Sequence, residues 1–218
     1  MTKKIFILLA FFSFSAATLS AQRVKPKAKP TPAPVIPEVG VLINGVVWAS
    51  RNVDAPGTFA ATPESPGMFY QWNCKVGWRS SIPVKNSKGD AKWNSSAAIY
   101  TTWRESCDPS PAGWRLPTRA ELEKLLETAK VDSKWTIRNG VNGRKFTDKT
   151  TGASIFLPAA GYRDYYIGTL YGAGMGGYYW SSMRDDRYGA YYMGFSSGGV
   201  NWSYDSRVFG FSVRSVAK

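Results

Sequence analysis

The sequence predicts an α+β fold, because a helix signal lies in the middle of the chain and strand signals follow one another at its end. Thr118 and Glu121 form a capping box ahead of recurring apolar residues, which predicts a helix over about residues 119–130. Apolar and other residues alternate over 190–196 and 210–216, as in half-buried antiparallel strands. One or two helices followed by a strand meander are typical of an α+β domain.

The other elements follow from local signals taken in chain order. Apolar or alternating runs predict strands or buried segments, and Gly, Pro and Asn clusters predict the loops between them. The expected strand-like segments are Val46–Val53, Met68–Trp72, Ile155–Arg163, Tyr178–Ser182 and a short one at Val200–Tyr204; the expected loops and turns include Ile82–Trp93, Asp108–Pro117, Asn139–Phe146 and Asp164–Gly177.

The N-terminus has the pattern of a secretory signal peptide over residues 1–21. Lys3 and Lys4 precede a short apolar run, small residues follow, and cleavage is expected after Ala21. The run is shorter than the ~20 residues that a membrane-spanning helix needs, so no membrane span is expected. Residues 22–40 carry five Pro and three Lys, which predicts an extended linker and leaves residues 41–218 as one domain.

The charge balance is basic and dispersed. The chain has a net charge of +13, and residues 41–218 hold 22 basic and 14 acidic side chains. No run of Lys or Arg and no nucleic-acid motif accompanies this excess, so nucleic acid is not an expected partner. A solvated surface is the default interpretation, although a basic face would also suit acidic glycans or another negatively charged partner.

The residue inventory argues against catalysis. The chain contains no His, which removes the commonest general base and metal ligand. Asp185 and Asp186 are too few ligands for a Ca²⁺ site, and no metal or cofactor is expected. Cys74 and Cys107 are the two cysteines, and in an exported chain such a pair most often forms a disulfide; the alternative is a reactive cysteine pair.

The C-terminal tail has the composition of a binding surface. From Tyr178 to Ser206, 20 of 29 residues are Tyr, Ser, Gly, Asp or Asn. Tyr supplies large, stiff contact area, and small polar residues supply adaptable hydrogen bonds. The alternative is a Tyr-rich sheet with ordinary polar loops. The candidate ligand-binding residues are Tyr165, Tyr166, Tyr178, Arg184, Asp185, Asp186, Arg187, Tyr188, Tyr192, Asn201, Trp202, Tyr204 and Asp205.

Trp202 is the strongest single candidate for an exposed aromatic anchor, because Asn201, Ser203 and Tyr204 surround it. The alternative is that its ring forms a lid over the sheet. Position 192 alternates with the apolar positions 191, 193 and 195, so Tyr192 is expected to leave the core.

The order of eight short motifs resembles the Fibrobacter succinogenes major paralogous domain over Val41 to Val216. The motifs read NVDAPGTFA, PESPGMFYQW, DPSPAGWRLPTRAELEKLL, NGVNGRKF, IFLPAAGYR, GYYWSS, AYYMGF and GFSVRSV. The resemblance implies a C-type-lectin-like fold and export from a Gram-negative bacterium. That family often has cysteines where this chain has Ser110 and Ser215, so a disulfide between Cys74 and Cys107 would replace the familiar one.

A subset of that family is similar in a further way. Target proteins of diversity-generating retroelements end in a variable region whose mutagenesis yields Tyr, Asp, Ser and Gly codons. The tail has this composition. The resulting hypothesis is an exported, secreted or cell-surface module that binds a protein or glycan ligand through a Tyr-rich face. The alternative is a structural surface or adhesin component whose tail only completes the sheet.

Overall fold

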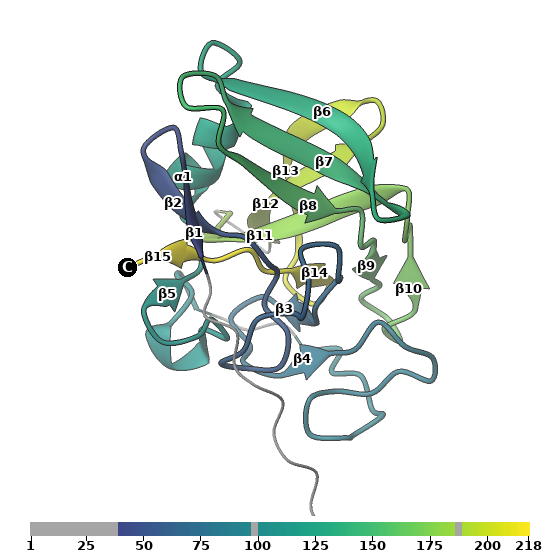
Figure 1. Ribbon diagram of the computed structural model, residues 1–218. Helices are drawn as coiled ribbons and strands as arrows, with labels where there is room; N and C mark the ends of the chain where they lie inside the picture. The colour runs from purple at the N-terminus through teal and green to yellow at the C-terminus, as the bar shows by residue number, and fades with distance from the viewer. Residues whose placement is uncertain (1–38, 97–99, 186–188) are drawn as a thin grey trace, which may run out of the picture. The chain divides into compact units, whose positions relative to one another are not determined.

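The tail strands lie in the larger of three sheets. The computed structural model describes residues 39–96, 100–185 and 189–218 (Figure 1). The chain divides into two units, Met1–Ile36 and Pro37–Lys218, and the described residues belong to the second. The expected signal peptide and all of the expected linker except Val39 and Gly40 lie outside the described residues.

The expected C-type-lectin-like α+β fold is wrong, because the described chain is mostly β with one short α-helix. Its strands form three open sheets with mainly antiparallel pairing. The strands are β1 Gly40–Ile43, β2 Val46–Ala49, β3 Phe69–Gln71, β4 Gly77–Trp78, β5 Trp114–Arg115, β6 Val131–Arg138, β7 Val141–Asp148, β8 Ser154–Pro158, β9 Tyr162–Arg163, β10 Leu170–Tyr171, β11 Gly176–Arg184, β12 Gly189–Ser196, β13 Gly199–Ser206, β14 Gly210–Ser212 and β15 Val216–Ala217.

The strand order brings distant parts of the chain together. The largest sheet runs β10-β9-β14-β11-β12-β13, with β3 on β14 and β4 on β3. A four-stranded sheet runs β1-β2-β15-β5, and a three-stranded sheet runs β6-β7-β8. In Figure 1 the three-stranded sheet crosses in front of β11, β12 and β13. Thus the early strands β2 and β3 pair with strands from the last part of the chain.

The predicted helix is confirmed at its start and is shorter than expected. Thr118 accepts a hydrogen bond from the Glu121 N–H, and the Glu121 side chain accepts one from the Thr118 N–H, so both halves of the capping box are present. The α-helix α1 spans Arg119–Glu123, and a 3₁₀ turn over Lys124–Leu126 replaces the expected continuation.

The β6–β7 hairpin occupies a region in which only a turn was expected. Asn139 and Gly140 have φ values of 47° and 79°, so both adopt the left-handed conformation that a two-residue hairpin turn requires. Val131 to Arg138 pair with Val141 to Asp148 without a register shift. The Asn-Gly pair was a turn signal, but the strand before it has too little alternation to be recognised from sequence.

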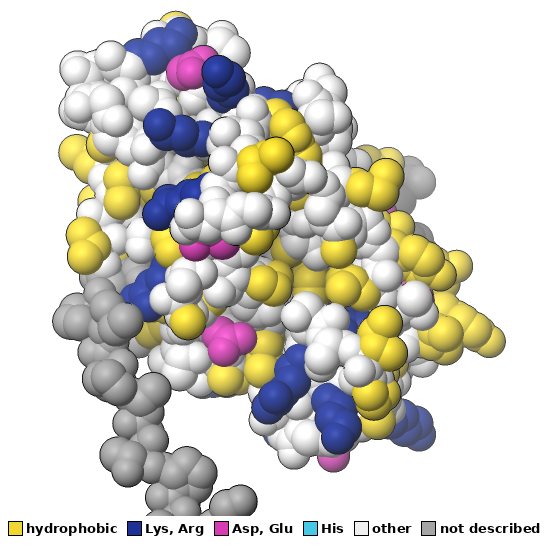
Figure 2. Space-filling view, turned by 45° about the vertical axis from the view of Figure 1, so that its right-hand side comes forward, with side chains coloured by type: hydrophobic (Ala, Val, Ile, Leu, Met, Phe, Trp, Pro, Cys, Tyr) yellow, Lys and Arg dark blue, Asp and Glu magenta, His cyan; other side chains and the backbone are white. Residues whose placement is uncertain are grey.

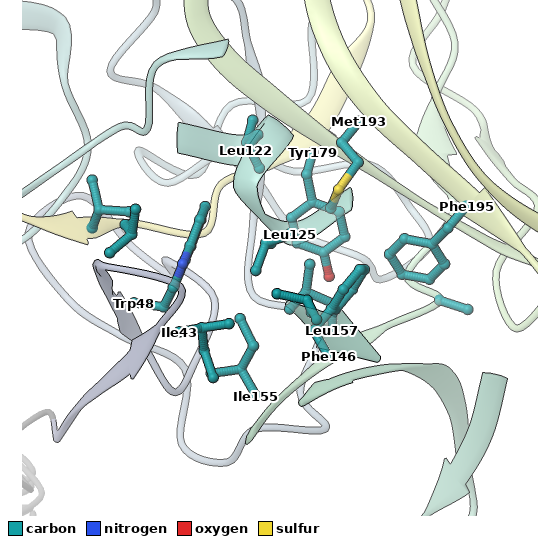
Figure 3. Close-up of a cluster of buried hydrophobic side chains, with 14 residues drawn as sticks. Ile43, Trp48, Leu122, Leu125, Phe146, Ile155, Leu157, Tyr179, Met193 and Phe195 are labelled. Carbon is teal, nitrogen blue, oxygen red and sulfur yellow. The ribbon is translucent and has the colours of Figure 1, made fainter. Parts of the chain in front are cut away.

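One face of the largest sheet closes over a hydrophobic core. Tyr179, Met193 and Phe195 on this face pack against Phe146 and Leu157 of the three-stranded sheet (Figure 3). Leu122, Leu125, Ile43 and Trp48 complete the cluster from the helix side and from β1 and β2. The alternation in β12 is therefore confirmed at 193 and 195, whereas Tyr191 is only half-buried.

A hydrogen-bond network inside the domain joins all three sheets. Arg214 is fully buried, and its guanidinium donates to the Ala49 and Phe156 carbonyls and to the Asn52 side-chain oxygen, each at 3.0 Å. The Asn52 amide donates to the Tyr179 hydroxyl at 3.2 Å, and that hydroxyl donates to the Pro158 carbonyl at 2.9 Å. Burial raises the pKa of Tyr179 to about 12, so its hydroxyl remains a donor at neutral pH.

Removing the Tyr179 hydroxyl should destabilise the fold. Tyr179→Phe leaves the Pro158 carbonyl without this donor and the Asn52 amide without this acceptor. The free energy of unfolding, measured by urea denaturation, should fall by about 1–3 kcal/mol. The matched control is Tyr171→Phe, which removes a hydroxyl from an exposed ring and should change stability by less than ~0.5 kcal/mol. Equal stabilities for the two variants would contradict the importance of the network.

Glu121 should make stability depend on acid pH. Burial alone would raise the pKa of its carboxyl, but hydrogen bonds from Arg115 and Thr118 outweigh this and lower the pKa from 4.5 to about 2. The folded state then binds this proton less readily than the unfolded state, so the stabilisation exists above pH 4.5 and is lost as the pH falls toward 2.

Glu121→Gln should therefore be less stable than the parent protein at neutral pH, and the difference should shrink toward pH 2. Denaturant midpoints measured across this range check the prediction. Glu123→Gln, which removes an exposed ion pair with Arg119, should give only a small difference at neutral pH. A constant gap between Glu121→Gln and the parent would contradict the assignment.

Candidate functional site

The second face of β11, β12 and β13 carries the candidate site. Part of this face belongs to a second core cluster that includes Trp180 and Phe211, and Tyr192 packs against that cluster instead of leaving the core as expected. Directly paired residues share a face, and one row across the three strands consists of Tyr178, Gly194 and Asn201. The next row consists of Trp180, Tyr192 and Ser203. Each row therefore changes from an aromatic side chain on β11 to a small polar one on β13.

An open hollow of about 530 Å³ lies over this face at the tip of the β12–β13 hairpin. Its lining carries no charged side chain and consists of Tyr178, Tyr192, Gly194, Phe195, Ser196, Gly198, Gly199, Val200 and Asn201. The hollow thus has an aromatic side, a polar side and a glycine-rich end.

Gly194 keeps the floor of the hollow open. A Cβ at this position would lie 3.1 Å from Asn201 Oδ1 and 3.2 Å from Tyr192 Cε2, so it would crowd both side chains. The absence of a side chain lets a bound molecule approach the backbone between the tyrosines and Asn201.

The tyrosine hydroxyls of the hollow are neutral at physiological pH. Burial raises the pKa of Tyr178, and the neighbouring Tyr162 adds to this increase. Burial also raises the pKa of Tyr192, and a hydrogen bond with Ser203 offsets part of the increase. Both hydroxyls can therefore donate and accept hydrogen bonds to an uncharged ligand.

A buried arginine fixes the hairpin tip beside the hollow. The Arg144 guanidinium donates to the Ser196 carbonyl at 3.0 Å and to the Ser133 hydroxyl at 2.9 Å. Arg144 is 6% exposed, and burial lowers its pKa. The tip of the hairpin is consequently tied to β6 and β7 before any ligand arrives, which limits the entropy lost on binding.

Aromatic rings continue from the hollow across the sheet. The Tyr178 ring centroid lies 5.9 Å from Tyr192 and 4.9 Å from Tyr162, and Tyr162 lies 6.0 Å from Tyr171. Tyr171 is half exposed on β10, on the strand path opposite β13. Figure 2, in which the side of the domain that carries β9 and β10 comes forward, shows several exposed groups of hydrophobic side chains, a class that includes tyrosine.

Five of the predicted site residues share this face. Tyr178, Tyr192 and Asn201 line the hollow, and Arg184 and Asp205, which both pair with Ala190, lie farther along the same face. Burial raises the pKa of the half-buried Asp205 carboxyl. Gly194, Ser196 and Ser203 were not among the predicted ligand-binding residues, and the strand register was needed to place them on this face.

Trp202 and Tyr204 lie on the opposite face. Trp202 is half-buried against the core, and the Arg119 guanidinium lies 5.7 Å from its ring, so the ring is a lid over the sheet. Tyr204 is 61% exposed and contacts Tyr191 edge to face. Neither side chain lines the hollow.

The remaining candidates are dispersed. Tyr165 and Tyr166 are exposed on the loop after β9, where the Asp164 carboxylate accepts three backbone N–H bonds. Asp185 is half-buried just after the end of β11. The predicted residues Asp186, Arg187 and Tyr188 lie outside the described residues.

The predicted disulfide is absent from the structure, in which Cys74 and Cys107 are free thiols. Burial raises the pKa of Cys74. Other contacts join the two segments: Trp72 and Trp103 meet edge to face, and the Arg104 N–H donates to the Asn73 side chain at 2.8 Å. The link predicted as covalent is therefore made by packing and hydrogen bonding.

One family of domains matches the part of the chain that contains the hollow. A domain of unknown function, DUF8237, matches residues 129–216, which is less than half of the chain but includes β6 to β14. No curated protein matches the chain. No solved structure matches it. Within the described residues, no helix is long and apolar enough to cross a membrane, and no three His, Cys, Asp or Glu side chains gather as metal ligands.

The position of Trp202 gives a stability prediction. Trp202→Ala should remove packing from the core edge and cost about 2 kcal/mol, since full truncation of a buried Trp costs ~3–5 kcal/mol. The neighbouring Asn201→Ala change, at an exposed position, should stay within ~0.5 kcal/mol. Urea denaturation of both variants checks this. An unchanged midpoint for Trp202→Ala would show that the ring is not a lid.

Proposed function

We propose that the protein is an exported, non-catalytic binding module that holds an uncharged glycan in the hollow between Tyr178, Tyr192 and Asn201. The observation that carries the proposal is the composition of this hollow, which joins an aromatic side to a polar side without any charged side chain. Export rests on the N-terminal sequence pattern.

A sugar ring fits this chemistry because it is itself two-sided. The C–H face of the sugar can lie against a tyrosine ring. The hydroxyls at the edge of the sugar can form hydrogen bonds with amide and hydroxyl groups of the protein. Small-molecule sites generally combine apolar walls with a few placed polar groups. Tyr178 and Tyr192 supply the wall, and Asn201 and Ser196 supply the polar groups. An acidic glycan would need a cation, and none lines the hollow.

The length of the aromatic row favours a chain of sugars over a single one. Tyr162 and Tyr171 continue from Tyr178 toward β10, each ring within 6.0 Å of the next. Such a row offers several stacking positions across neighbouring strands, which lie about 4.8 Å apart. A glycan lying across the strands could use more than one of them.

The resemblance to the Fibrobacter succinogenes major paralogous domain gains support from one contact. The Ser110 and Ser215 hydroxyls, at the positions where that family often has cysteines, lie 2.8 Å apart. Two cysteines at these positions would be close enough to pair. We therefore keep the family relation as a proposal, without its expected fold.

Diversification of the tail remains a proposal as well. Asn201 is exposed beside Gly194, so substitutions at this position would spare the core, whereas Ser203 and Asp205 are half-buried beside Tyr192 and Ala190. A reverse transcriptase gene and a near-copy of the tail-coding DNA beside the gene would support it.

Binding should depend on the hollow and on little else. A glycan array should identify uncharged glycans that bind, and titration calorimetry with one of them should show losses of about 1–2 kcal/mol for Asn201→Ala and for Tyr178→Phe. Tyr178→Phe removes only a hydroxyl, so the packing of its ring on Tyr162 and Phe211 remains.

The matched control is Tyr166→Ala, which removes an exposed tyrosine ring that does not line the hollow. This variant should bind like the parent protein. Full binding by both hollow variants, or loss of binding in Tyr166→Ala alone, would move the site elsewhere. If no glycan binds, the structural or adhesin interpretation replaces this one.

A further inference from the structure

Strand β13 is an unprotected edge of the largest sheet. It pairs with β12 over eight residues without a register shift, and no other described strand lies on its outer side. Proteins usually protect such edges with Lys, Pro, a bulge or a very short strand. The β13 sequence GVNWSYDS contains no Lys, Arg or Pro.

The outer side of β13 carries free backbone groups. In an antiparallel pair, alternate residues direct N–H and C=O away from the neighbouring strand. The two-residue loop between Ser196 and Gly199 assigns the outward groups to Val200, Trp202 and Tyr204. Within the described residues, no hydrogen bond reaches the backbone of these three.

We propose that two copies of this chain pair through β13, antiparallel and about a two-fold axis at Ser203, so that one sheet continues across both copies. The argument for a second copy is self-complementarity. This register sets Asn201 opposite the partner's Asp205, where an amide can donate to a carboxylate. It sets Trp202 opposite the partner's Tyr204, an aromatic cross-strand pair.

The side chain opposite Asp205 favours this register over the next one. Asp205 is the only charged residue of β13, and the axis at Ser203 places the Asn201 amide of the partner copy opposite its carboxylate. An axis at Trp202 would set Asp205 opposite the partner's Gly199, which has no side-chain donor. The exposed Tyr204 ring would also gain cover from the partner's Trp202.

The pairing would combine two hollows on one surface. A two-fold axis perpendicular to the sheet keeps the Asn201 face of both copies on the same side, and Asn201 lies next to the seam. The partner's Asp205 would then extend the polar side of the hollow. Two linked sites bind a repeating ligand more tightly than one site does. This consequence rests on the proposed function, whereas the pairing itself does not.

A cysteine placed on the axis tests the register. In a Cys74→Ser/Cys107→Ser background, Ser203→Cys sets two thiols directly opposite each other, and mild oxidation should link two chains. The matched control is Asn201→Cys on the same strand and face, which lies opposite the partner's Asp205 and should cross-link at least about tenfold more slowly. Equal rates for the two variants would overturn the proposed axis.

A proline on the outer edge tests the pairing itself. Tyr204→Pro removes an N–H that points away from β12, so the monomer should keep its circular dichroism spectrum. Sedimentation equilibrium up to the millimolar range should show dimers for the parent protein and for Tyr204→Thr, but monomers for Tyr204→Pro. A parent protein that stays monomeric throughout would overturn the proposal. Tyr178→Phe should still dimerise, which separates this result from a failure of glycan binding.

Discussion

The buried network of Asn52, Tyr179 and Arg214 is the constraint on which the arrangement of the sheets depends. A buried guanidinium is costly unless its donors are paired, and Arg214 donates to β2, to β8 and to Asn52. Tyr179 continues the network from β11 to β8. Because these bonds join all three sheets, the position of the Tyr178–Tyr192 face follows from polar contacts on the other side of the same strands.

Arginine plays the same role elsewhere in the fold. Arg163 is 1% exposed and donates to the carbonyls of Arg79, Ser81 and Gly168, which ties two irregular loops to the sheet. Arg144 fixes the hairpin tip beside the hollow in the same way. A planar guanidinium has five N–H donors, so one arginine can form hydrogen bonds with several backbone carbonyls at once. In the sequence these residues look like dispersed surface charge, since most arginines are exposed.

The features that could be predicted are those set by local chemistry. The capping box at Thr118 and the alternation at Met193 and Phe195 depend on neighbours along the chain, and both are present. The helix length and the fold class depend on tertiary packing. The chain after Glu123 forms a 3₁₀ turn in which Leu125 is buried, and the burial of side chains along β6 has no clear period. A sequence pattern cannot show such tertiary effects.

The binding face shows why register decides a site. Tail composition pointed to Trp202 and Asn201 alike, yet they are consecutive residues on a strand and must face opposite ways. Trp202 lies on the core face, because its partner Met193 on β12 is buried there together with Phe195. Asn201, Gly194 and Tyr178 lie on the other face, where they line the hollow beside a second core cluster. An edge strand with one side committed to the core, the other to a ligand and its outer backbone to a second copy would use every direction that a strand offers.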